Sequence, residues 1–346
     1  GAALALAAMQ HAKGIDLLRA VIAGYEISTR IGVVMGRAHY RYWHNTGTIG
    51  SFGAAVAASA LLKAKPAQIQ HALAVVASFA AGLQQAFRMD SHSKPLHAGR
   101  AAEAGVLAGL GASKGLIGSL DVLDGDAGFG VAMSSAADWS KATEALGSRW
   151  HIASMTFKNH GCCGHTFAAI DGALILQQRL QLSRNNILED IQSIEVASYA
   201  EALAVANIAQ PRTAAEAKFS MRYVVAHALL YGAVRLDAVS ASRLEDRAIR
   251  ELMKRIEVRE DAAISAAFPK QRAASVTINL RDGTRETHFQ PTRIGDPDAP
   301  LSDAALSDKF LELSSAQLGE TGASAALERL WHIEHSNDNL CFRRPT

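Results

Sequence analysis

The sequence predicts a mainly α-helical protein whose helical domain is interrupted by an α+β insert. The 346 residues are 49% hydrophobic but only 6% aromatic, with abundant alanine, and this mix suits closely packed helices better than a sheet sandwich. Strand-like alternation begins near residue 191 and ends near residue 289, whereas helical spacing of apolar residues precedes and follows that stretch. We therefore expect a helical domain over 1–155, an α+β insert over 156–292, and a return to the helical domain over 293–346.

The first part predicts a series of helices. Ile15–Ile31 repeats apolar residues at helical spacing. Ser51–Leu62 is almost wholly small and apolar, which predicts a helix buried on all sides. Pro66 suits the first turn of the next helix, and Gly99–Leu110 predicts another helix of small residues. The glycine-rich Leu123–Val131 predicts a loop.

The insert carries three local signals. Ile191–Val205 begins with the alternation of a strand. Thr213 and Glu216 have the spacing of a capping box ahead of an apolar run, which predicts a helix start. Two alternating runs within Ala274–Phe289 surround an Asp-Gly turn and predict a hairpin. Helical patterns then return in SDAALSDKFLELSS and GASAALERLWHIEH.

Composition excludes several classes of protein. The 35 Lys+Arg and 33 Asp+Glu leave a net charge of +2, too small for a dedicated nucleic-acid binder. Three cysteines form no disulfide framework and favour a reducing, cytoplasmic compartment. The sequence contains no uncharged apolar run of about twenty residues, so it predicts no membrane span. Its first residues do not resemble a signal peptide. Because the chain opens without Met, inside a helical pattern, we expect it to be a fragment.

Two segments of the helical part place polar groups where a helix is expected to begin. His44 precedes a glycine-punctuated entry to the buried helix, where it could exchange protons or simply cap a turn. Lys94 and His97 lie in the cationic stretch HSKPLHAGR, which opens the next small-residue helix. An ammonium beside a helix N-terminus suits an anion, although a solvated loop has the same composition.

A third segment, FKNHGCCGH, contains Lys158 and the adjacent Cys162 and Cys163. Adjacent cysteines do not have the usual spacing of zinc ligands. A catalytic pair, with a cysteine nucleophile and a histidine base, is also conceivable. On spacing alone, a structural loop at the domain junction is favoured over both. The glycines of LDGDAGFGV do not reproduce a nucleotide-binding motif. On the apolar run after the capping box, Tyr223 could lie on either face.

Taken together, these segments resemble the MmgE/PrpD family, which includes 2-methylcitrate dehydratases, cis-aconitate decarboxylases and iminodisuccinate epimerases. The resemblance rests on GYEISTRIG, WHNTGTIGSFGAAVAASALL, SKPLHAGRAAEAGVLAGL, LDGDAGFG, FKNHGCCGHTFAAIDGAL and AEAKFSMRYVVAHALL, in this order. It implies a helical-bundle domain, a smaller α+β lid domain, a site in the cleft between them, a homodimer, and neither metal nor cofactor.

The resemblance also assigns residues to roles. It implies His44, Lys158 and Tyr223 as catalytic residues, and Lys94, His97 and Lys158 as residues that bind a small polycarboxylate substrate. The lysines would stabilise the negative charge that builds up when a proton is removed next to a carboxylate. His44 would exchange the proton and Tyr223 would donate a hydrogen bond or proton.

The reaction stays open at this point. One carbanion-like intermediate serves a dehydratase, a decarboxylase and an epimerase, and a catalytically silent scaffold would keep the same fold. The K-P-L-H form is closer to the decarboxylase and epimerase branch, whereas Asn45 and the pair Cys162-Cys163 depart from the patterns of relatives. The resemblance further implies that N-terminal helices are missing, with an Asp-rich segment and another histidine. We therefore expect the 346 residues by themselves to be inactive or nearly so.

Overall fold

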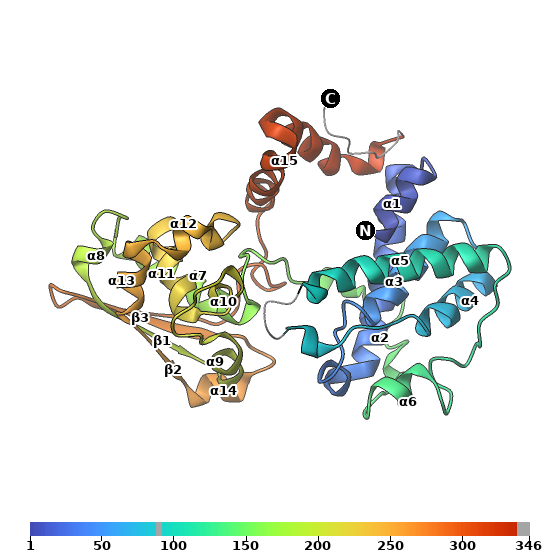
Figure 1. Ribbon diagram of the computed structural model, residues 1–346, viewed down its shortest axis with the longest axis horizontal. Coiled ribbons are helices and arrows are strands. Elements are labelled where there is room, and N and C mark those ends of the chain that lie inside the picture. Colours follow the sequence, from blue (N-terminus) through green and yellow to red (C-terminus); the bar gives the residue numbers. More distant parts are fainter. Residues whose placement is uncertain (88–91, 338–346) are drawn as a thin grey trace. The chain divides into compact units, whose positions relative to one another are not determined.

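The structure is a computed structural model that describes residues 1–87 and 92–337. The chain divides into two compact units (Figure 1). Unit 1 comprises Gly1–Ser154 and the chain from Ser314 onward, and unit 2 comprises Met155–Leu313. Most of the secondary structure in the described residues is helical, and unit 2 also contains one four-stranded sheet. The prediction of a mainly α protein with an α+β part is thereby confirmed.

Unit 1 is built from helices. They are α1 (Ala2–Met9), α2 (Gly14–Tyr40), α3 (Ile49–Leu61), α4 (Pro66–Ala77), α5 (Ser93–Ser113) and α6 (Phe129–Met133), with short 3₁₀ turns η1 (Gln84–Phe87), η2 (Trp139–Lys141), η3 (His151–Ser154) and η6 (Ile333–His335). The helix α15 (Asp303–Trp331) begins in unit 2 and ends in unit 1. It breaks at Gly319, whose φ of 70° lies outside the helical region, so that the two expected helical segments meet there.

Helix α3 lies at the centre of unit 1 and packs against α1, α2, α4 and α5. Its Phe52 is fully buried. Small residues permit this packing, because a Cβ on Gly105 of α5 would lie 2.3 Å from the Cβ of Ala54 on α3. A Cβ on Gly24 of α2 would likewise lie 2.7 Å from the Gly53 carbonyl oxygen. The predicted close approach of small-residue helices is therefore confirmed.

Unit 2 contains the sheet and the shorter helices. Its strands are β1 (Ile191–Ser198), β2 (Ile256–Glu260), β3 (Ala274–Leu280) and β4 (Arg285–Gln290). Its helices are α7 (Phe167–Arg179), α8 (Ile187–Asp190), α9 (Ala200–Ala206), α10 (Ala214–Ala217), α11 (Met221–Tyr231), α12 (Ala241–Leu244), α13 (Arg247–Met253) and α14 (Ala262–Ala267), with η4 (Gly164–Thr166) and η5 (Asp237–Val239).

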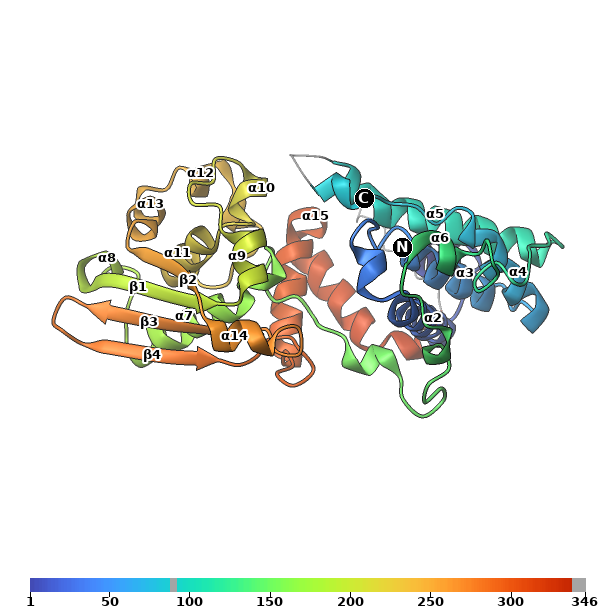
Figure 2. The same cartoon turned by 90° about the horizontal axis from the view of Figure 1, so that it is seen from below.

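The sheet has the strand order β2-β1-β3-β4, and its strands lie side by side in Figure 2. Strand β1 runs parallel to β2 and antiparallel to β3, with Val196 opposite Val258 on one side and Val276 on the other. Strands β3 and β4 form the predicted hairpin. Helix α7 packs on β3 and β4, and α11 packs on α7, α13 and β2. The buried core of unit 2 lies between these helices and the sheet.

Two local predictions needed correction. The predicted loop Leu123–Val131 ends in helix α6, because Phe129 is buried with its ring edge-on to Phe52 at 4.9 Å between centroids. The predicted capping box does form, since Thr213 Oγ1 accepts from the Glu216 N–H at 3.2 Å. The helix that it starts, however, ends at Ala217, and α11 begins with a new cap at Ser220.

Contacts extend unit 2 past residue 292, where we expect the insert to end. Arg235 forms a 3.0 Å ion pair with Glu312 of α15, and Lys309 Nζ donates to the Lys158 carbonyl. Farther along the chain, Ile333 joins Leu6 and Leu17 in a core of unit 1. None of the helices in the described residues is both long and apolar enough to cross a membrane.

Candidate functional site

Two histidines of unit 1 meet although 53 positions separate them in the sequence. His44 lies in the turn that precedes α3, and His97 lies on the first turns of α5. Their Nδ1 atoms are 2.8 Å apart, which is a hydrogen-bond distance. One ring must donate its Nδ1 proton and the other ring must accept it. The two rings therefore share one proton at this contact, and the two Nδ1 atoms cannot both carry a proton while the bond is present.

Backbone bonds fix the turn that carries His44. Its N–H donates to the Gly82 carbonyl at 2.9 Å, and the Gln84 N–H donates to the Tyr42 carbonyl at 2.9 Å. Gly82 has a φ of +144°, and a Cβ at this position would lie 3.2 Å from Nδ1 of His97. A glycine here therefore satisfies the backbone conformation and leaves room for the imidazole.

The electrostatic setting keeps His44 neutral. Burial, the neighbouring His97 and the positive charge of Lys94 lower the pKa of His44 to about 4. Lys94 and His97 are three residues apart on α5, which places them on the same side of the helix. The structure thus brings together His44, Lys94 and His97, three of the predicted site residues. At neutral pH the cluster combines an uncharged imidazole that can accept a proton with an ammonium that attracts anions.

Lys158 of unit 2 combines an anchored backbone with an exposed side chain. The preceding Phe157 N–H donates to the Gly295 carbonyl at 2.8 Å, and Thr156 Oγ1 donates to Asp296 Oδ1 at 2.6 Å. Gly295 has a φ of +106°, and a Cβ there would lie 2.0 Å from the Phe157 carbonyl oxygen. The chain just before Lys158 is therefore held in place, and the exposed ammonium of Lys158 is accessible to an anion.

Tyr223 lies in the core of unit 2 and is 0% exposed. Its hydroxyl donates to the Ala238 carbonyl at 2.7 Å, and burial raises its pKa to about 12. To donate a hydrogen bond or proton to a substrate, this hydroxyl would have to leave Ala238.

The sequence analysis missed a second pair of polar rings in unit 2. His165 Nδ1 lies 2.7 Å from the hydroxyl of Tyr199, whose ring stacks on Phe268 with 4.6 Å between centroids. Burial, followed by the charges of Arg272, Arg293 and Lys158, lowers the pKa of His165 to about 4. His165 stood in the crowded segment that we singled out, whereas Tyr199, one residue after strand β1, carried no signal of its own.

The remaining polar residues of that segment have structural contacts. His160 accepts the Val234 N–H at Nδ1 and lies 3.1 Å from Asp171 at Nε2, so Nε2 carries the proton. Cys162 Sγ lies 3.3 Å from Thr166 Oγ1, and burial raises the thiol pKa to about 12. A protonated, buried thiol is a poor nucleophile. Across residues 1–87 and 92–337, no three His, Cys, Asp or Glu side chains are grouped as metal ligands.

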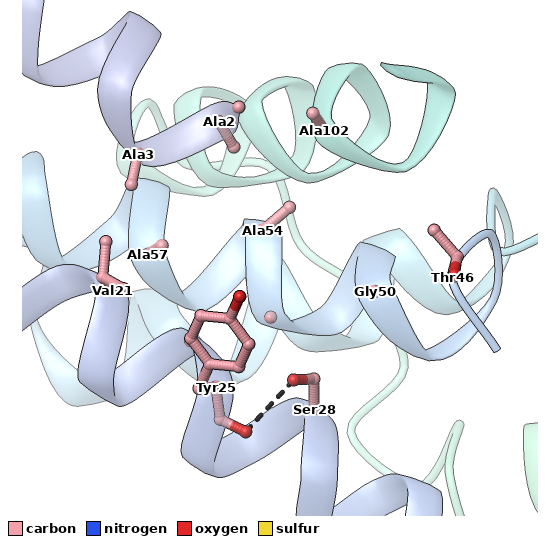
Figure 3. A pocket seen from close by; sticks show the side chains of 13 residues that line it. Ala2, Ala3, Val21, Tyr25, Ser28, Thr46, Gly50, Ala54, Ala57 and Ala102 are labelled. Carbon is pink, nitrogen blue, oxygen red and sulfur yellow. Dashed lines mark hydrogen bonds between the residues drawn. The ribbon is translucent and has the colours of Figure 1, made fainter. Parts of the chain in front are cut away.

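A hollow of about 420 Å³ also lies in unit 1, between α1, α2, α3 and α5 (Figure 3). Small residues such as Ala2, Ala54 and Ala102 line it, together with Tyr25 and Ser28. Ser28 Oγ donates to the Tyr25 carbonyl at 3.1 Å. Among the described residues that line it, none is Asp, Glu, Lys, Arg or His. It therefore has no side chain suited to proton transfer near neutral pH.

Comparison with known proteins identifies the family. Residues 1–142 match the MmgE/PrpD N-terminal domain, and residues 160–333 match the MmgE/PrpD C-terminal domain. The cis-aconitate decarboxylase-like protein oryM of Aspergillus oryzae (strain ATCC 42149 / RIB 40) is 28% identical over 341 residues, which cover 93% of this chain and 68% of the relative. The cis-aconitate decarboxylase of Homo sapiens is 27% identical over 330 residues, with coverages of 94% and 67%.

The cis-aconitate decarboxylase of Mus musculus is 27% identical over 314 residues, which cover 88% of this chain and 62% of the relative. The chain thus spans about two thirds of the length of these relatives. The two domain matches together account for most of the chain and agree with the resemblance seen in its motifs. The chain belongs to the MmgE/PrpD family.

Proposed function

We propose that the protein is a cofactor-independent lyase that acts on a di- or tricarboxylic acid by proton transfer next to a carboxylate. The observation that carries this proposal is the 2.8 Å contact between His44 and His97 beside Lys94. It places a neutral base next to a cation, the combination required for removing or returning a proton on an anionic substrate. Relatives named cis-aconitate decarboxylase support a substrate of the cis-aconitate or 2-methylcitrate type.

The proposed chemistry needs only the chain's own groups. In a decarboxylation, the bond to one carboxylate breaks, carbon dioxide leaves, and the electron pair stays on the substrate carbon until a proton reaches it. In a dehydration, a base removes a proton and hydroxide leaves with a second proton. In a dehydration the neutral His44 accepts the proton, whereas in a decarboxylation it must first take up a proton before it returns one to the carbon. The Nδ1 contact with His97 sets its tautomer and ring orientation. Lys94 binds a carboxylate and stabilises the negative charge that builds up.

Unit 2 contributes to this proposal through Lys158, whose exposed ammonium would bind a second carboxylate. Its membership of the site rests on the family resemblance, as does the homodimer that the resemblance implies. Tyr223 takes part only if its hydroxyl exchanges the Ala238 carbonyl for substrate. The cytoplasmic location expected from the cysteine content belongs to the proposal as well.

Turnover assays with cis-aconitate, 2-methylcitrate and iminodisuccinate test the proposal. The first two substrates distinguish decarboxylation from dehydration, and the third detects an epimerase. The assay uses the 346-residue chain. Absence of turnover of all three substrates, with an intact fold, would favour the silent scaffold over the lyase.

Substitution of the lysines tests their role in binding. We expect Lys94→Met and Lys158→Met each to weaken binding of a tricarboxylate about 10- to 150-fold, because a charge-assisted hydrogen bond contributes about 1.5–3 kcal/mol. Calorimetry measures the affinity, and circular dichroism shows whether the fold is kept. Lys270→Met, which removes a surface lysine of unit 2, is the charge-matched control. Unchanged affinity in both variants would exclude the lysines from the substrate site.

A further inference from the structure

Unit 2 carries a second hollow, of about 600 Å³, and none of its lining residues is assigned to the proposed site. It lies where the loop before α10, the first turn of α11, the end of α13 and the start of β2 come together. Its volume falls in the range of small-molecule sites, about 300–1,000 Å³. Its lining residues are Ala209, Gln210, Pro211, Arg212, Arg222, Arg250, Met253, Lys254, Ile256 and Glu257.

The charge of this hollow is strongly positive. Four of its lining residues are cationic, and Glu257 is the single carboxylate among them. Two nearby carboxylates are already engaged. Glu251 pairs with Lys254 at 2.5 Å, and Glu216 accepts the backbone N–H groups of Arg212 and Thr213. Cations gathered in one hollow repel each other, and a bound anion relieves that repulsion.

Arg222 and Arg250 are the half-buried arginines of the hollow. Elsewhere in unit 2, Arg235, Arg243 and Arg293 each form an ion pair with a carboxylate, whereas Arg255 donates to the Leu188 and Ile191 carbonyls. Among the described residues, neither Arg222 nor Arg250 has a carboxylate partner, and their bonds go to neutral acceptors.

These neutral bonds fix the guanidinium groups in place. Arg222 donates from Nε to the Ile256 carbonyl at 3.1 Å and from Nη1 to Asn207 Oδ1 at 2.7 Å. Arg250 donates from Nε and Nη2 to the Leu244 carbonyl at 2.9 and 2.5 Å. Each side chain keeps a further nitrogen, Nη2 in Arg222 and Nη1 in Arg250, whose N–H groups can bind an anion. A guanidinium that is already held in one orientation loses less entropy when it binds a planar carboxylate or a phosphate.

We propose that this hollow is a binding site for a small, multiply charged anion that presents carboxylate or phosphate groups. Arg222 and Arg250 bind the anionic groups, and the exposed Arg212 extends the positive field toward solvent, whereas Lys254 is paired with Glu251. Pro211, Met253 and Ile256 supply an apolar wall for the carbon skeleton of the ligand. None of its lining residues is assigned to the proposed catalytic site, although the Arg250 guanidinium carbon lies 5.8 Å from the centre of the Tyr223 ring.

Calorimetry with citrate and, separately, with inorganic pyrophosphate tests the site and distinguishes the two sources of negative charge. We expect at least one of them to bind with a Kd of about 1 mM or lower at low salt. Binding of pyrophosphate alone would indicate a phosphate-bearing ligand, and binding of citrate alone a polycarboxylate. Arg222→Gln and Arg250→Gln should each weaken the binding about tenfold or more.

Two controls define the site. Arg285→Gln removes an exposed arginine of β4 and should leave the affinity unchanged. Lys94→Met should leave the pyrophosphate affinity unchanged, and citrate is titrated in the Lys94→Met background so that binding at the proposed catalytic residues does not contribute. If Arg222→Gln loses its fold by circular dichroism, Arg212→Gln, at an exposed position, replaces it, with an expected loss of severalfold. The proposal is overturned if neither anion binds, if the substitutions in the hollow have no effect, or if Arg285→Gln weakens binding equally.

Discussion

Two histidines of unit 1 and two histidines of unit 2 lie in opposite settings. In unit 1, His44 and His97 are half-buried, contact each other, and lie in a turn and on a helix start beside Lys94. In unit 2, His160 and His227 lie deep in the core. The first setting leaves a proton free to move between a ring and a ligand, whereas the second fixes the ring for packing. The type of residue alone therefore does not indicate its role, and the surroundings decide it.

The largest effect that we expect comes from His44. His44→Gln should lower kcat by about 10²- to 10⁴-fold, the range for a lost general acid or base. The free energy of unfolding should change little, because the ring is half-buried and glutamine keeps a polar group near His97. Steady-state kinetics and urea denaturation on the same protein measure both quantities. His71→Gln, at a half-buried histidine of α4, is the matched control, and a full-rate His44→Gln enzyme would exclude the proposed role.

His160 should show the reverse pattern. His160→Leu removes the donor to Asp171, a carboxylate that is 1% exposed and otherwise accepts the Ile294 N–H at 2.8 Å. It also leaves the Val234 N–H without its acceptor. We expect a loss of about 3–5 kcal/mol in the free energy of unfolding, as for other broken buried pairs. Denaturation in urea measures this loss, and a stability close to that of the unsubstituted protein would refute the structural role.

His227 tests the buried setting through pH. It is 3% exposed, and neither ring nitrogen has a hydrogen-bond partner among the described residues. Burial, followed by the charge of Arg243, lowers its pKa to about 4 from the ordinary 6.5, although Asp237 and Asp246 act in the opposite direction and His160 adds a small lowering. The unfolded chain therefore takes up a proton between pH 6.5 and 4 while the folded protein does not. The neutral ring therefore makes its full contribution to the free energy of unfolding above pH 6.5. This contribution is lost as the pH falls toward 4.

We expect His227→Leu to remove a pH dependence of about 1–3 kcal/mol between pH 6.5 and 4. Leucine has no proton to take up, and it leaves no unbonded ring nitrogen in the core. Urea denaturation of both proteins at several pH values gives the difference. His44 and His165 also have a pKa of about 4, and their contribution cancels because both proteins contain them. A difference in stability that is the same at every pH would contradict the prediction.

The sequence predicted the features that depend only on residues close together along the chain. The helix start at Pro66, the capping box at Thr213 and the hairpin of β3 and β4 all formed, because each is decided within a few residues. The start of α11 was missed although its cap is local, since Ser220 Oγ accepts the Tyr223 N–H at 3.3 Å. The same hydroxyl is also held by a more distant contact, because it donates to the Ile208 carbonyl at 2.6 Å. No local pattern reveals such a bond.

The same limit applies to the candidate site. Spacing singled out His44 and the segment with Lys94 and His97, but their meeting across 53 residues was implied only by the family resemblance. The spacing of four residues permits the pair in which Arg30 Nε donates to Glu26 Oε1 at 2.7 Å, but it gave no sign that this pair is buried. Arg30 then donates to the Ala142 and Glu144 carbonyls and so holds the segment after α6 against α2. Contacts of this kind depend on the packed fold, which sequence periodicity does not specify.

The smallest effect that we expect comes from substitution of Tyr223. This residue tests the comparison most directly, because it is proposed for catalysis but is buried in the core of unit 2. Tyr223→Phe keeps the ring and removes only the hydroxyl, so the Ala238 carbonyl loses its donor inside the core. We expect the free energy of unfolding to fall by about 1 kcal/mol, the typical net contribution of one hydrogen bond. We expect kcat to stay within about tenfold, below the loss that follows removal of a general acid. Denaturation and kinetics on one preparation measure both. If kcat instead falls by about 10²-fold or more while stability holds, the hydroxyl leaves Ala238 during the reaction, and Tyr223 belongs with His44 rather than with His160.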